Sequence, residues 1–119
     1  MTKVLLAEDD ASMMYLLKTL LTLEGFEVVT LDIAEDVIRG ARSEKPDVML
    51  MDVHLAGKNG VDLLTEMRKD AELKDLVVIM SSGMNMEYEC RDAGANAFLL
   101  KPFMPDDLIA AIRRNVQPQ

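Results

Sequence analysis

Acidic residues follow two apolar segments of the chain, at the point where each segment ends. Asp52 ends the apolar run that begins at Val48, and Glu8 and Asp9 come directly after Lys3–Ala7. Short apolar runs of this kind are typical of strands buried on both faces of a parallel sheet. Ligands of α/β proteins bind beyond the carboxyl ends of such strands. These acids are therefore candidates for binding or catalysis, although an aspartate at this point can also simply turn the chain or cap the next helix.

A hydroxyl group and an ammonium group follow two further strand-like segments. Leu76–Met80 is followed by two adjacent serines, and Ala97–Leu100 is followed by Lys101. Because side chains alternate between the two faces of a strand, only one of the serines can face a site at this edge. We predict that Ser82 faces the site rather than Ser81, since Ser82 stands directly before a glycine.

These residue types together favour phosphoryl transfer. Unit charges about 4 Å apart repel by on the order of 4 kcal/mol at an effective dielectric constant near 20. A cluster of carboxylates therefore requires protonation or a bound cation, and oxygen ligands suit Mg²⁺. In such a site a carboxylate can attack phosphorus in line while the metal and a lysine neutralise the phosphoryl oxygens.

Strands and helices alternate along the chain, and this alternation predicts the fold. A further strand is expected at Phe26–Leu31, and helices are expected at Ser12–Glu24, Ala34–Glu44, 61–69 and Asp106–Val116. Such alternation requires right-handed crossovers and a parallel sheet covered on both faces by helices. We therefore predict one doubly wound α/β domain over residues 1–119, with five parallel strands. In the order 2-1-3-4-5, the strand ends that carry the acids face one crevice.

The segment that should form the fourth helix has a weak helical pattern. The apolar residues within Gly83–Ala93 spread around a helix instead of forming one stripe. A helix of ten residues or fewer depends on packing for its stability. We therefore expect a fourth helix that is short or frayed.

Composition argues against several classes of function. The 119 residues include 21 acidic and 13 basic side chains, which give a net charge of −8. This charge repels nucleic acids and anionic membranes, so we expect neither as a partner. The single cysteine, Cys90, excludes an internal disulfide, and the chain has neither a long apolar run nor a secretion leader. A cytoplasmic location is expected.

With these residues in place, the chain resembles the response-regulator receiver domain of two-component signalling, which has a flavodoxin-like fold. The resemblance covers essentially all of the sequence. Four motifs carry it: VLLAEDD at Val4–Asp10, LMDVHLAGKNG at Leu50–Gly60, IMSSG at Ile79–Gly83 and AFLLKPF at Ala97–Phe103. Each motif is weak alone, but four in this order at strand ends are specific.

The resemblance implies a magnesium site and a phosphoacceptor. Glu8 and Asp9 would be the acidic pair, and Asp52 would be both metal ligand and phosphoacceptor. His54 would lend its backbone carbonyl to Mg²⁺, while its side chain is expected at the mouth of the pocket.

The resemblance also implies a conformational switch. Ser82 would be the switch hydroxyl, Phe98 the rotating aromatic residue and Lys101 the lysine of the site, with Pro102 after a cis peptide bond. The phosphoryl group would come from a histidine kinase or a phosphotransfer protein, and the signal would pass to an output protein. Such a regulator is not a metabolic enzyme, since it catalyses only its own phosphorylation and slow autodephosphorylation.

Two other functions would also place an acid at a strand end or use this fold. An aspartyl-nucleophile phosphatase of the haloacid-dehalogenase type would require a second aspartate two residues after the first, where this chain has His54. A pseudo-receiver that only binds other proteins would be expected to lack an acid, the acceptor or the lysine, and all three are present here. The chain departs from the family at Ala56, where proline is usual, so we expect a less rigid loop after Asp52. The pattern fits a free-standing regulator and a part of a longer protein equally.

Overall fold

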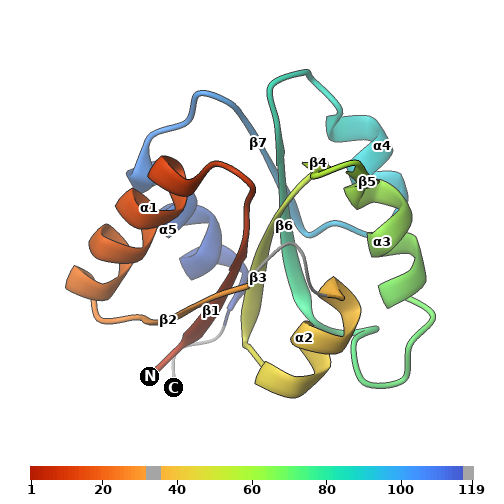
Figure 1. Cartoon of the computed structure of the whole chain (residues 1–119), viewed down its shortest axis with the longest axis horizontal. Helices are drawn as coiled ribbons and strands as arrows, with labels where there is room; N and C mark the ends of the chain where they lie inside the picture. Colours follow the sequence, from red (N-terminus) through yellow and green to blue (C-terminus); the bar gives the residue numbers. More distant parts are fainter. Residues whose placement is uncertain (32–35, 117–119) are drawn as a thin grey trace.

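A five-stranded parallel sheet forms the centre of the computed structural model, which describes residues 1–31 and 36–116 (Figure 1). The strand order is β2-β1-β3-β6-β7. This confirms the predicted order 2-1-3-4-5, because β6 and β7 are the fourth and fifth strands of the sheet. The strands are β1 Lys3–Ala7, β2 Glu27–Thr30, β3 Val48–Asp52, β6 Val77–Ser82 and β7 Ala97–Leu100.

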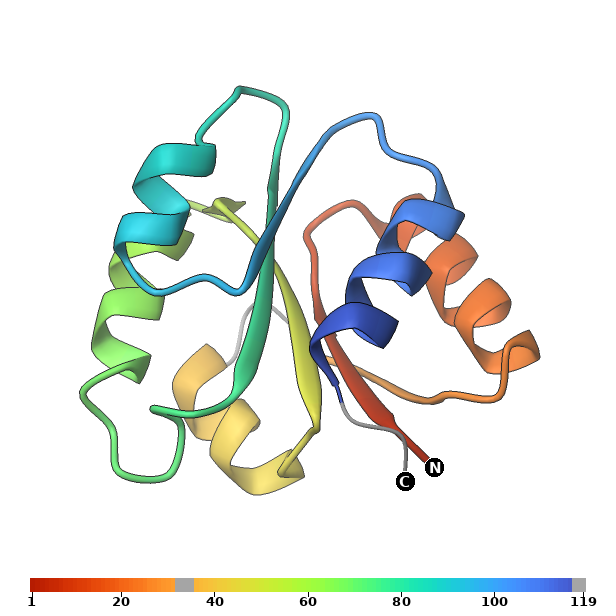
Figure 2. The ribbon, with the colours of Figure 1, turned by 180° about the vertical axis from the view of Figure 1, so that it is seen from behind.

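Helices cover both faces of this sheet, as predicted. The helices are α1 Ala11–Leu23, α2 Val37–Glu44, α3 Gly60–Met67, α4 Glu87–Asp92 and α5 Pro105–Asn115. α1 and α5 lie on one face, and α2, α3 and α4 lie on the other (Figures 1 and 2). Each face has its own apolar core, with Leu17 and Leu108 in the first and Leu64 and Cys90 in the second. Within the described ranges, no helix is long and apolar enough to cross a bilayer.

The ends of the helices follow from local capping groups. Asp10 caps α1, because its Oδ1 accepts a hydrogen bond from the Met13 amide at 3.1 Å. Gly25, at φ +95°, lies in the left-handed region after this helix, as predicted. Asp36 caps α2 by accepting from two amides of its first turn. The predicted start of that helix, Ala34, lies outside the described residues.

The fourth helix, α4, is short, as predicted. It has six residues, and its N-cap residue, Met86, makes no side-chain capping bond. Cys90 is its only fully buried side chain, whereas Tyr88 is 81 % exposed. Few apolar contacts therefore stabilise this helix.

A small β-hairpin between β3 and α3 was not predicted. Its strands, β4 His54–Leu55 and β5 Lys58–Asn59, pair in antiparallel fashion. The two residues between them, Ala56 and Gly57, both have positive φ, at +42° and +85°. Because proline fixes φ near about −65°, a proline at position 56 could not adopt this turn. The segment expected to be a loosened loop is thus a paired hairpin.

Arg68, directly after α3, joins two loops at the amino edge of the sheet. Its guanidinium donates to the carbonyl oxygens of Leu73, Lys74 and Leu76 before β6, at 2.8 to 3.2 Å. It also donates to the carbonyl oxygen of Gly94, at 2.8 and 3.0 Å, and to Asn96 Oδ1. No pattern in the sequence indicates this role.

Candidate functional site

The predicted acids meet at the carboxyl edge of the sheet. Glu8 and Asp9 follow β1, and Asp52 is the last residue of β3, which pairs directly with β1. One carboxylate oxygen from each of the three side chains lies within 4.8 Å of the others. Glu8 and Asp52 are only 2 % and 5 % exposed, whereas Asp9 is exposed. The cluster therefore opens to solvent on the side of Asp9.

Lys101 reaches this cluster from the end of β7. Its Nζ donates to Asp52 Oδ2 at 2.7 Å and to Glu8 Oε1 at 3.0 Å. The peptide bond from Lys101 to Pro102 is cis, as the resemblance implied. The structure thus brings together the predicted lysine and the two buried carboxylates.

The electrostatics of the cluster are unbalanced, since three carboxylates share one ammonium. Burial is the main cause that raises the pKa of Glu8; the Lys101 hydrogen bond opposes it, and the charge of Asp52 adds to it. Burial would lower the pKa of Lys101, but its bonds to Asp52 and Glu8 outweigh burial and raise it. Among the described residues, none donates a hydrogen bond to Glu8 Oε2, although Lys101 Nζ lies 3.0 Å away.

This arrangement suits a hard divalent cation. The oxygens of the three acids converge, one acid is open to solvent, and the three carboxylates share one ammonium. Mg²⁺ prefers carboxylate oxygens and keeps several water ligands, so a half-open cluster of acids fits it. The residues present therefore fit the ion that the sequence predicted.

The two serines at the end of β6 differ in orientation. Ser81 pairs directly with Asp52 in the register of β3 and β6, so the two side chains point to the same face. The Oγ of Ser81 is fully buried and has no hydrogen-bond partner among the residues that the structure describes. In contrast, Ser82 Oγ accepts from the Met84 amide at 3.1 Å.

This register corrects the prediction that Ser82 faces the site. The prediction chose Ser82 because it stands directly before Gly83, but the strand continues through both serines and its register decides which one faces the site. Alternation then places Ser82 on the face of Met80 and Ser81 on the face of Asp52. The sequence signal that could have identified Ser81 is its even spacing from Ile79, which packs in the same core cluster as Leu50.

His54 and Phe98 are the remaining predicted residues of the site. The His54 amide donates to Asp52 Oδ1 at 3.1 Å, and its side chain is exposed, as expected for the mouth of the pocket. Phe98 is half-buried and stands opposite Met80 in the register of β6 and β7. The role of the His54 carbonyl in metal binding and the rotation of Phe98 remain predictions.

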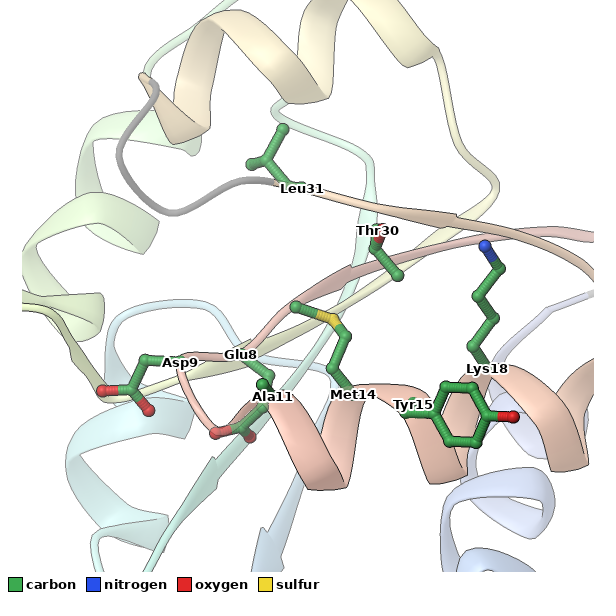
Figure 3. A pocket seen from close by; sticks show the side chains of 8 residues that line it. All are labelled: Glu8, Asp9, Ala11, Met14, Tyr15, Lys18, Thr30 and Leu31. Carbon is green, nitrogen blue, oxygen red and sulfur yellow. The ribbon is translucent and has the colours of Figure 1, made fainter.

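An open hollow of about 380 Å³ adjoins the acids on the side of α1. Met14, Tyr15 and Lys18 of α1 form one wall, and Thr30 and Leu31 form the other (Figure 3). Glu8, Asp9 and Ala11 complete its lining. The hollow therefore borders two of the three acids, Glu8 and Asp9, and does not reach Asp52.

Comparison with known proteins agrees with this geometry. The family model described as the response regulator receiver domain matches residues 4–113. The transcriptional regulatory protein KdpE of Staphylococcus aureus is 35% identical over 112 residues, which are 94% of this chain and 48% of that protein. The chain thus spans about half the length of this curated relative.

Solved structures give the same result for the fold. The chemotaxis response regulator CheY4 of Vibrio cholerae superposes with a TM-score of 0.87 at 27% identity, covering 98% of this chain and 99% of that one. The receiver domain of the sensor histidine kinase PA1611 of Pseudomonas aeruginosa, solved with magnesium in its active site cleft, has a TM-score of 0.83 at 25% identity, with 96% of each chain covered. The strand order, the acid cluster with its lysine, and the family match over nearly the whole chain lead to one conclusion: the chain belongs to the response regulator receiver domain family.

Proposed function

We propose that the chain works in the cytoplasm as a switch in which Asp52 accepts a phosphoryl group from a histidine kinase or phosphotransfer protein. The observation that carries this proposal is the environment of the Asp52 carboxylate. It lies at a strand end, its two oxygens face the His54 amide and the Lys101 ammonium, and two further acids adjoin it. A buried nucleophile held in this way needs little reorganisation before it reacts.

The transfer step follows from these contacts. A carboxylate oxygen of Asp52 attacks phosphorus, an O–P bond forms, and the P–N bond to the donor imidazole breaks. The electron pair of that bond returns to the imidazole nitrogen. Lys101 then neutralises part of the charge of the phosphoryl group, which is roughly −2. Glu8, Asp9, Asp52 and the His54 carbonyl would hold Mg²⁺, which when bound supplies charge neutralisation at the phosphoryl oxygens; the PA1611 receiver supports this choice of metal.

Ser81 is the hydroxyl that we assign to the phosphorylated state. Its unpartnered Oγ shares the face of Asp52 and would donate to a phosphoryl oxygen there. Closure of the end of β6 would shift the loop before α4, and Phe98 would rotate inward beside it. The signal then passes to an output domain or protein, so the chain acts as a phosphoacceptor regulator and not as a metabolic enzyme.

Intact mass spectrometry after incubation with acetyl phosphate tests the proposal. In Mg²⁺ the unmodified protein should gain one phosphoryl group, and it should gain none when EDTA removes the metal. Asp52→Asn should gain none in either condition. Asp62→Asn, which changes an exposed aspartate on α3, is the matched control. It should gain one phosphoryl group in Mg²⁺, as the protein without substitutions does.

Other outcomes would contradict the proposal in distinct ways. An adduct on Asp52→Asn at the normal rate would show that another residue is the acceptor. Sustained hydrolysis of an added phosphomonoester would support the alternative function of an aspartyl-nucleophile phosphatase. No adduct with any donor would support a domain that only binds other proteins.

A further inference from the structure

The hairpin after Asp52 contains one of two non-glycine residues with positive φ in the described chain. Lys45, at φ +50°, ends α2, where a left-handed residue is common. Ala56, at φ +42°, has no such helix to end. Together with Gly57 it forms a turn with positive φ at both central residues, which is the type I′ turn that fits two-residue hairpins. A side chain is disfavoured in this region, so the conformation of Ala56 is imposed by its surroundings.

Both strands of the hairpin are fixed to the fold near the acceptor. Leu55 is fully buried in the core that contains Leu64. Asn59 caps α3 by accepting from the Val61 amide at 2.9 Å. The turn therefore links one strand anchored in the core to another anchored at the start of a helix.

Gly60, the residue directly after the hairpin, packs against the backbone of the acceptor and of Val53. The Gly60 amide donates to the Val53 carbonyl at 2.6 Å. A Cβ at position 60 would lie less than 3.0 Å from the Asp52 carbonyl oxygen and from Val53 Cα. Because the neighbouring atoms are backbone, they cannot move away without displacing Asp52. The first residue of β4, His54, donates its amide to Asp52 Oδ1.

We propose that the Ala56–Gly57 turn is a positioning element for phosphoryl transfer. By closing the hairpin, it holds the His54 amide against Asp52 Oδ1 while Lys101 holds Oδ2, so the turn sets the orientation of the carboxylate. This inference rests on the proposed role of Asp52 as acceptor. It assigns to two residues outside the acid cluster an effect on the rate of the reaction.

Gly57→Ala tests the conformation of this turn without adding a clash. A Cβ at Gly57 meets no atom within 4 Å, so the substitution acts only through its φ of +85°. Gly25→Ala is a matched control, since Gly25 has φ +95°, equally open surroundings and a position at the end of α1, far along the chain from the acids. Both variants should lose similar stability.

Two measurements separate positioning from stability. The first-order rate of adduct formation with acetyl phosphate and Mg²⁺ should fall about tenfold in Gly57→Ala, because a misplaced nucleophile reacts more slowly, and should stay unchanged in Gly25→Ala. Amide exchange at His54 should become faster only in Gly57→Ala. Gly57→Asn should recover most of the rate, since asparagine adopts positive φ more readily than alanine.

The inference is overturned if Gly57→Ala reacts at the rate of the unmodified protein, or if Gly25→Ala slows equally at equal loss of stability. An unmodified protein that forms no adduct would overturn the proposed function together with it. If Gly57→Ala does not fold, Ala56→Pro carries the test, because proline cannot adopt the positive φ of this turn. An unchanged rate and unchanged His54 exchange in folded Ala56→Pro would overturn the inference.

Discussion

Two half-buried cations, at opposite edges of the sheet, have surroundings of different kinds. Arg68, at the amino edge, donates to neutral oxygens only, and each of its guanidinium nitrogens has a partner. Lys101, at the carboxyl edge, lies among acids that outnumber it. Nearby, Ser81 Oγ lacks a hydrogen-bond partner within the described ranges, and Glu8 Oε2 has only its ion pair with Lys101. The comparison shows how polar groups that stabilise a fold differ from polar groups that remain available for a ligand.

Arg68→Met should have the largest effect on stability. It removes the hydrogen bonds to the carbonyl oxygens of Leu73, Leu76 and Gly94, of which that of Leu73 still accepts from the Leu76 amide. We expect the free energy of unfolding to fall by about 3 kcal/mol, measured by urea denaturation. Lys69→Met, at the exposed neighbouring position, should change it by less than about 0.5 kcal/mol. Equal small effects of both substitutions would refute a structural role for Arg68.

Glu8→Gln should act in the opposite direction and raise stability. Because burial holds the pKa of Glu8 above its usual range, ionisation of this side chain costs free energy in the folded protein. This cost begins as the pH rises above the pKa that Glu8 has in the unfolded chain. It reaches its full size above the pKa that Glu8 has in the folded protein. We expect a gain on the order of 1 kcal/mol at neutral pH and none in acid, where both states carry the proton.

Urea denaturation of Glu8→Gln at neutral pH and at a pH below the unfolded pKa of glutamate checks this sign. Glu66→Gln, at an exposed position of α3, is the control and should show little change at either pH. A loss of stability in Glu8→Gln at neutral pH would mean that the bond to Lys101 outweighs burial. The polar groups at the carboxyl edge would then stabilise the fold, as Arg68 does at the amino edge.

The two adjacent serines sharpen the comparison within one strand. Ser82→Ala removes the hydrogen bond to the Met84 amide and should cost about 1 kcal/mol. Ser81→Ala removes a buried hydroxyl that has no partner in the described structure, so it should be neutral or slightly stabilising. Thermal unfolding of the two variants measures both effects. A larger loss for Ser81→Ala would show that its hydroxyl is satisfied in the resting protein.

The sequence predicted the sheet because its strands are apolar runs with clear ends. Val48–Asp52 is buried throughout, so both the strand and its terminal acid could be identified from residue types. The convergence of Glu8, Asp9 and Asp52 then followed from strand order alone. The choice between the serines failed for a different reason, because it relied on the glycine after Ser82, whereas the even spacing of Ser81 from Ile79 places Ser81 on the face of Asp52.

Arg68 and the hairpin could not be predicted for physical reasons. The acceptors of Arg68 lie in two loops up to 28 residues away, and no local pattern marks a long side chain that folds back onto carbonyl oxygens. The hairpin strands have two residues each, which is too short for an alternating pattern. Its turn also places alanine where positive φ is unfavourable.

Chemical denaturation with and without Mg²⁺ tests most directly whether the carboxyl edge is built to receive a ligand. Free Mg²⁺ at about ten times its Kd should raise the free energy of unfolding by about 1.4 kcal/mol. This increase should persist in Arg68→Met and disappear in Asp52→Asn. An unmodified protein that gains no stability from Mg²⁺, or an Asp52→Asn variant that gains as much, would contradict the account.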